Sequence, residues 1–76
     1  MYIPTKNDLE GLNFNHEYDD YHEELQAWHT QCATDININI KDNWEVEYYL
    51  DQNKDLQFYP ESFDDLKTFI RILTPQ

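Results

Sequence analysis

The chain has 76 residues, of which 39% are hydrophobic and 16% aromatic, with a single cysteine and a net charge of −11. These values exclude an intrachain disulfide and the aromatic-poor composition of intrinsic disorder, and they argue against nucleic acid or anionic membrane as a direct partner because like charges repel. Because no apolar run approaches the ~20 residues that cross a bilayer, we expect one domain, residues 1–76, in the reducing cytoplasm.

Residues 1–14 are predicted to form an irregular segment, because Pro4 and Gly11 interrupt them. Within this segment, Thr5 and Asp8 have the three-residue spacing of a pair that caps a short helical turn.

Residues 15–32 are predicted to form the first helix. Asn15 is an acceptable N-cap, and the acidic residues after it lie where the helix dipole favours anions. The large apolar residues follow steps of three and four and would share one stripe: Tyr18, Tyr21, Leu25, Trp28 and Cys32.

Residues 35–59 change to period two and predict a three-stranded antiparallel meander. A two-residue first loop would place isoleucines opposite glutamates, whereas a three-residue loop at 41–43 places Ile38 opposite Val46. The same loop places Ile36 opposite Tyr48 and Ile40 opposite Trp44. A second three-residue loop at 51–53 would then place Tyr48 opposite Leu56 and Val46 opposite Phe58.

Residues 62–73 are predicted to form the second helix, with Ser62 as N-cap and Asp65 three residues later. The fold class is therefore α+β in the order α-β-β-β-α, and we expect both helices to pack on the apolar face of the sheet.

The opposite face of the predicted sheet is polar and carries two glutamates within one strand: Asn37, Asn39, Glu45, Glu47, Tyr49, Gln57 and Tyr59. A solvated face of an antiparallel sheet is ordinary. Glutamate, however, has a low preference for strands, so this face is also a candidate for binding.

A second candidate is the acidic run in the predicted first helix. Five carboxylates fall within eight residues, and no lysine or arginine occurs from residue 7 through residue 40. Like charges four residues apart destabilise a helix slightly, so a helix selected for stability alone would intersperse lysines. The alternative interpretation is a solvated acidic surface.

No residue pattern indicates catalysis, a cofactor or a metal site. His29 and Cys32 are three residues apart, but two ligands on one helix fall short of the three or four that zinc requires. We interpret Cys32 as a core thiol and Ser62 as a helix cap, and we expect a protein that is not an enzyme.

In size and composition the chain resembles the small acidic proteins of phages and mobile elements that inhibit restriction, CRISPR or other DNA-binding enzymes. That resemblance implies an inhibitor that occupies the nucleic-acid site of a basic protein by charge mimicry. The residues expected to bind the partner are Glu17, Asp19, Asp20, Glu23, Glu24, Glu45, Glu47, Tyr49, Asp51 and Tyr59.

Two alternatives are compatible with the same residues. The chain could be an immunity protein or accessory subunit that binds a basic partner away from its nucleic-acid site. It could also be a small domain that forms homodimers through strand 35–41 or strand 55–59, with charge that serves only solubility.

Overall fold

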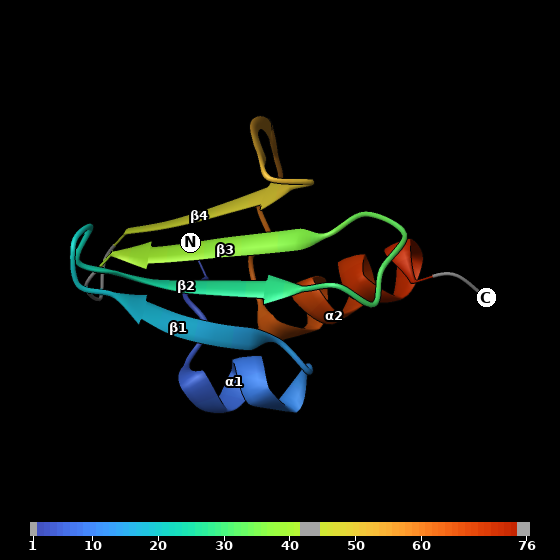
Figure 1. The fold of residues 1–76 in the computed structure, drawn as a ribbon. Coiled ribbons are helices and arrows are strands. Elements are labelled where there is room, and N and C mark those ends of the chain that lie inside the picture. Colours follow the sequence, from blue (N-terminus) through green and yellow to red (C-terminus); the bar gives the residue numbers. More distant parts are fainter. Residues whose placement is uncertain (1, 42–44, 75–76) are drawn as a thin grey trace.

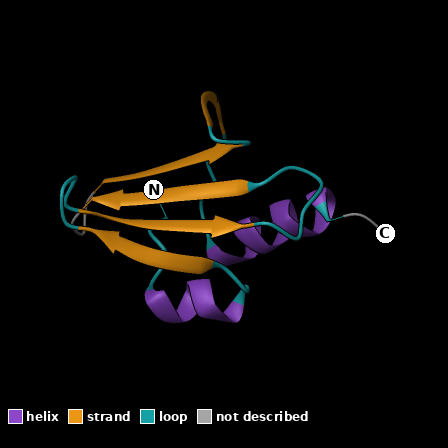
Figure 2. Ribbon diagram, in the orientation of Figure 1, coloured by secondary structure: helices purple, strands orange, loops and turns teal. Residues whose placement is uncertain are grey.

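The computed structural model describes residues 2–41 and 45–74. Five antiparallel strands form one sheet in the order β1-β2-β3-β4-β5, and a helix stands at each end of the chain (Figures 1 and 2). The elements are α1 (Lys6–Gly11), β1 (Asn15–Asp19), β2 (Glu24–His29), β3 (Ile36–Lys41), β4 (Glu45–Leu50), β5 (Asn53–Gln57) and α2 (Phe63–Leu73). The protein is α+β, but the predicted three-stranded meander is wrong. Neither helix of the described chain is long and apolar enough to cross a membrane.

The predicted helix at residues 15–32 is wrong, because this segment forms the β1–β2 hairpin. The apolar stripe of that helix is dispersed in the structure. Tyr18 and Leu25 are cross-strand partners, Tyr21 lies 89% exposed in the turn, and Trp28 faces the other side of the sheet from Leu25.

The side chain of Asp19 explains why the chain turns here instead of continuing as a helix. Its Oδ1 accepts hydrogen bonds from the backbone N–H groups of Tyr21, at 2.9 Å, and His22, at 3.2 Å. Such a local bond competes with helical bonding. The second cause is β3, which needs a partner on each edge because all five residues of Ile36–Ile40 are buried.

The sequence offered strand 35–41 as one of two edge strands for a homodimer. The structure instead places this segment, as β3, at the centre of the sheet. The two faces of β3 are as predicted, but the register with β4 is wrong by two residues: Ile38 pairs with Tyr48, and Ile40 pairs with Val46. Lys41 pairs with Glu45, so it belongs to the strand and not to the loop. The predicted pair of Ile40 with Trp44 falls on residues 42–44, outside the described residues.

The predicted loop at 51–53 and its register are also wrong. Only Asp51 and Gln52 separate β4 from β5, and both have positive φ, 53° and 54°. Two central residues with positive φ define the hairpin turn whose twist matches the flanking strands. Leu50 then pairs with Asn53 and Tyr49 with Gln57, so an irregularity in register follows the turn.

Gln52→Gly should stabilise the protein, because Gln52 is a non-glycine residue in the left-handed region. Asp-Gly is the preferred dipeptide for this turn, and the relief is about 1 kcal/mol. Urea unfolding followed by far-UV circular dichroism measures the change. Asn53→Gly, one residue beyond the turn, is the control and should destabilise; equal gains from both would contradict this account of the turn.

The core lies on one face of the sheet, between the strands, α2 and the N-terminal segment (Figure 1). Ile36, Ile38 and Leu66 are fully buried there. An aromatic row joins the sheet to the helix, because the ring of Phe58 lies 5.5 Å from Tyr48 and 4.8 Å from Phe69. Helix α2 follows the prediction for residues 62–73: it begins after Ser62, whose Oγ accepts from the Asp65 N–H at 3.1 Å.

Hydrogen bonds hold the N-terminal segment on the core face. The Tyr48 hydroxyl donates to the backbone carbonyl of Tyr2 at 2.6 Å, and the Tyr2 hydroxyl donates to Asp8 at 2.8 Å. Asp8 also caps α1 together with Thr5, which confirms the spacing argument for that pair. Helix α1 is thereby fixed beside the outer edge of β1, and its Leu9 is fully buried in the core (Figure 1).

His29 is buried on the core face at 3% exposure, against the ring of Phe14 and 3.6 Å from the Cys32 sulfur. Burial lowers the pKa of His29, and a backbone contact with Leu12 opposes this shift only in part. Cys32 is 8% exposed, which confirms the prediction of a core thiol.

The lowered pKa of His29 predicts that acid destabilises the fold. Below pH ~6.5 the unfolded chain binds a proton at this residue that the folded chain does not, so the free energy of unfolding falls by at most about 1.4 kcal/mol per pH unit. Urea unfolding from pH 7.5 to pH 5 should show this fall, and His29→Gln should reduce it. His16→Gln is the control, because its ring contacts only the exposed Glu10, at 3.3 Å. An unchanged slope in His29→Gln would contradict the assignment.

Candidate functional site

The face of the sheet opposite α2 carries polar residues of all five strands, and we call it the outer face (Figure 1). Strand pairing arranges its side chains in rows across the sheet. One row is Asp19, Glu24, Lys41 and Glu45; the next is Glu17, Gln26, Asn39 and Glu47; the third is Asn15, Trp28, Asn37, Tyr49 and Gln57.

The first two rows and the β1–β2 turn form an acidic half of the outer face. It holds seven of the ten residues predicted to bind a partner: Glu17, Asp19, Asp20, Glu23, Glu24, Glu45 and Glu47. The sequence predicted two acidic surfaces, one on a helix and one on a sheet. The structure instead brings both sets of carboxylates onto a single sheet face and its adjoining turn.

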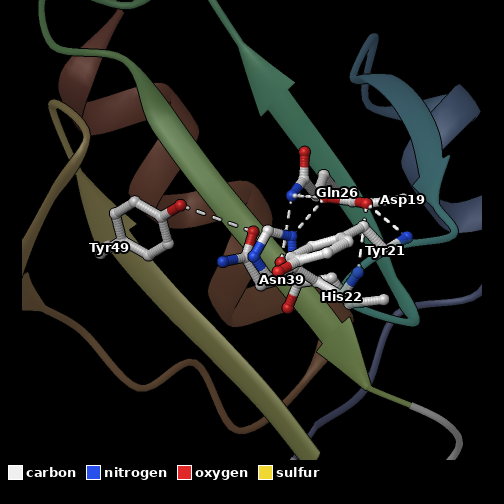
Figure 3. A network of polar contacts seen from close by, with 7 residues as sticks. Asp19, Tyr21, His22, Gln26, Asn39 and Tyr49 are labelled. Atoms are coloured by element: carbon white, nitrogen blue, oxygen red, sulfur yellow. Dashed lines mark hydrogen bonds and ion pairs between the residues drawn. The ribbon is translucent and has the colours of Figure 1, made fainter.

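Asp19 organises the turn at the edge of this acidic half (Figure 3). Besides two backbone N–H groups, its carboxylate contacts the His22 Nδ1 at 2.7 Å and the Gln26 amide at 3.2 Å. The hydrogen bond with the His22 side chain is the main cause of the lowered pKa of Asp19, with backbone bonds adding to it. Asp19 therefore stays ionised at a lower pH than an unperturbed aspartate would.

Asp19, His22 and Glu24 are also the one group in the described residues with three metal-ligating atoms within 4.8 Å of one another. Their atoms already serve other contacts. The Gln26 amide bridges Asp19 and Glu24, at 3.2 Å and 3.0 Å, and His22 bonds to Asp19. These hydrogen bonds explain why the three side chains lie together, because they stabilise the turn. The expectation of no metal site stays a prediction.

Beside the acidic half, the outer face has a shallow hollow of about 490 Å³ with polar and aromatic walls. Asn37 and Asn39 of β3 form its base, with Trp28 on β2 and Tyr49 on β4 as the cross-strand neighbours of Asn37. Thr30, Asp35 and Gln52 line the end away from the acidic half. Among the described residues, no lysine or arginine lines this hollow.

Asn37 is the unusual residue of the hollow. It is only 8% exposed, and its Nδ2 is buried without a hydrogen-bond partner in the described chain. Its neighbour Asn39 is equally buried but accepts a bond from the Tyr49 hydroxyl at 3.5 Å (Figure 3). A buried amide without a partner costs about 1–3 kcal/mol, so Asn37 does not serve the stability of the fold.

The other three residues predicted to bind a partner lie apart from one another. Tyr49 lies in the hollow, next to the acidic half, and the Lys54 ammonium lies 5.9 Å from its ring centre and 3.8 Å from Glu47. Asp51 is in the β4–β5 turn at the other end of β4 from Glu45. Tyr59 is away from both halves and lines a different hollow with Phe69 and Ile72 of α2.

The sequence interpretation missed Trp28, Gln26 and the unpaired amide of Asn37. Because Trp28 and Gln26 were expected in a helix, their position next to β3 could not be predicted. A signal was nevertheless present, because Leu25, Ala27 and His29 alternate with Gln26 and Trp28 in the pattern of a half-buried strand.

Asn37→Leu should raise the stability of the protein by about 1–2 kcal/mol, because a side chain of similar shape replaces an amide that lacks a partner. Urea unfolding at pH 7.5 measures the change. The control is Asn39→Leu, which removes the acceptor of the Tyr49 hydroxyl and should bring no gain. If Asn37→Leu is clearly destabilising, the Asn37 amide has a partner in solution.

Comparison with protein-family models, with curated proteins and with solved structures gives no significant match to this chain. Function must therefore be inferred from the outer face itself.

Proposed function

We propose that this protein is a non-enzymatic acidic inhibitor that binds a basic nucleic-acid-processing protein and blocks its nucleic-acid site by charge mimicry. The observation that carries the proposal is the acidic half of the outer face. Glu17, Asp19, Glu24, Glu45 and Glu47 stand in two adjacent rows of one sheet, and Asp20 and Glu23 extend them at the turn.

The dimensions of this surface support the proposal. The acidic rows run across four strands that are ~4.8 Å apart, which gives a width of about 14 Å. Duplex DNA carries a charge about every 1.7 Å of its axis, and its major groove is ~12 Å wide. The acidic half is therefore similar in width to a groove of the duplex whose place it would take.

Few cations offset these carboxylates. In the two acidic rows of the described sheet, Lys41 is the one basic residue, and Lys54 approaches Glu47 from β5 at 3.8 Å. A cationic partner is attracted by a field of this kind at long range, and salt screens that attraction.

The first test is affinity capture from a lysate of the source host at low salt, with mass spectrometry, repeated with excess duplex DNA. The expected result is a basic nucleic-acid-binding enzyme that duplex DNA displaces. A basic partner retained in the presence of DNA would favour the immunity or accessory function. No basic partner at all would overturn the proposal.

With the captured partner, Glu17→Gln combined with Glu45→Gln should weaken binding by at least tenfold, through removal of two exposed carboxylates from the acidic rows. Isothermal titration calorimetry at two salt concentrations measures the loss. The matched control is Glu61→Gln with Asp64→Asn, which removes two exposed charges at the start of α2, on the other side of the sheet. Equal losses from both pairs would show that net charge matters and the acidic half does not.

A further inference from the structure

We propose that the hollow beside the acidic half binds one arginine side chain of the basic partner. The guanidinium of that arginine stacks on the indole of Trp28 and pairs with the carboxylate of Asp35. This inference rests on the proposed function and deepens it, because it names the side chain that the protein recognises at contact.

Asp35 is a carboxylate without a cation at one end of the hollow. It is half-buried, and within residues 2–41 and 45–74 no lysine, arginine or histidine forms an ion pair with it. Hydrogen bonds between a guanidinium and a carboxylate are charge-assisted and frequently bidentate, so they are among the strongest in proteins. A ligand that pairs with Asp35 is therefore a cation.

Trp28 provides an aromatic surface for the flat part of that cation. It is half-buried and lines the hollow as the cross-strand neighbour of Asn37. Asp35 precedes Asn37 by two residues, which makes it the diagonal neighbour of Trp28, and such positions are ~7–8 Å apart. One guanidinium can therefore lie against the indole and reach the carboxylate. Among aromatic rings, indole attracts a cation most strongly.

The opposite wall of the hollow has a cation of the chain itself. The Lys54 ammonium lies 5.9 Å from the ring centre of Tyr49 and 3.8 Å from Glu47, and Lys54 is not among the residues that line the hollow. In the described chain, no such contact occurs at Trp28. A cation from a partner is therefore favoured at Trp28, away from Lys54.

The lining of the hollow favours arginine over lysine. A guanidinium is planar and weakly hydrated, and it offers five N–H donors, whereas an ammonium is compact and strongly hydrated. Thr30 and Gln52 line the same end as Asp35 and add oxygen acceptors for N–H groups that the carboxylate does not bind. Anionic ligands are opposed by Asp35 and by the net charge of −11.

The test uses three blocked pentapeptides, acetyl-Gly-Ser-Xaa-Ser-Gly-amide, with arginine, lysine or citrulline at the centre. Citrulline has the shape of arginine without its charge. In ¹⁵N-labelled full-length protein at low salt, the arginine peptide should shift the indole N–H signal of Trp28, which Trp28→Phe identifies. We expect it to bind at least tenfold more tightly than the citrulline peptide and at least threefold more tightly than the lysine peptide.

Asp35→Asn should weaken binding of the arginine peptide at least tenfold. The matched control is Asp64→Asn, which removes an exposed carboxylate at the start of α2 and should change the affinity less than twofold. Trp28→Leu is a second variant that should lose the same affinity as Asp35→Asn, and thermal unfolding confirms that each variant is folded.

Equal binding of the arginine and citrulline peptides would overturn the inference, as would an Asp35→Asn variant with unchanged affinity. A lysine peptide that binds as tightly as the arginine peptide would reject arginine as the occupant. Shifts confined to the acidic half, and lost in the Glu17→Gln and Glu45→Gln double variant, would remove the hollow but leave the proposed function intact. Failure of the proposed function looks different, because the arginine peptide then still shifts Trp28 while the host lysate yields no basic partner.

Discussion

Strand β3 is the constraint on which the rest of the structure depends. Both of its edges are paired and all five residues of Ile36–Ile40 are buried, so the sheet must supply a neighbour on each side. Its isoleucines point to the core and its asparagines to the outer face, and that alternation dictates which side chains of β2 and β4 share each face. The alternation of isoleucine and asparagine in residues 36–40 thus determines both the core face and the outer face of the sheet.

The outer face divides two tasks that interfaces commonly combine. In the proposed function, the carboxylates of the acidic half act at long range and are screened by salt, so they contribute mainly to the rate of encounter with the partner. The hollow beside them has the aromatic side chains of Trp28 and Tyr49 in its walls, and such side chains act only at contact. A protein that relied on charge alone would bind any basic surface, whereas contacts with these aromatic side chains would let it prefer one of them.

Local signals in the sequence were sufficient for some elements and misleading for others. The caps at Thr5 and Ser62 and the alternation of residues 36–40 depend on neighbouring residues, and the structure has them as predicted. Tyr18 and Leu25 show the limit of such reasoning. They are seven residues apart, as on one helical stripe, yet they are partners across a hairpin whose turn is fixed by the side chain of Asp19. Registers were missed because parity fixes the face of a residue but not its partner. The carboxylates of the site were predictable as a charge pattern, whereas the hollow depends on Trp28 and Asn37 meeting across strands.

The irregular register after the Asp51–Gln52 turn has a consequence for how the molecule behaves in concentrated solution. A straight, apolar outer strand is a template on which further chains add and aggregate. Strand β5 is short, its register with β4 slips after one pair, and all five of its residues are exposed, with Lys54 and Asp55 adjacent in the middle. Bulges and charges of this kind discourage growth from an edge. The fold therefore leaves its outer face open while its free edge strand at β5 is a poor template for fibrils.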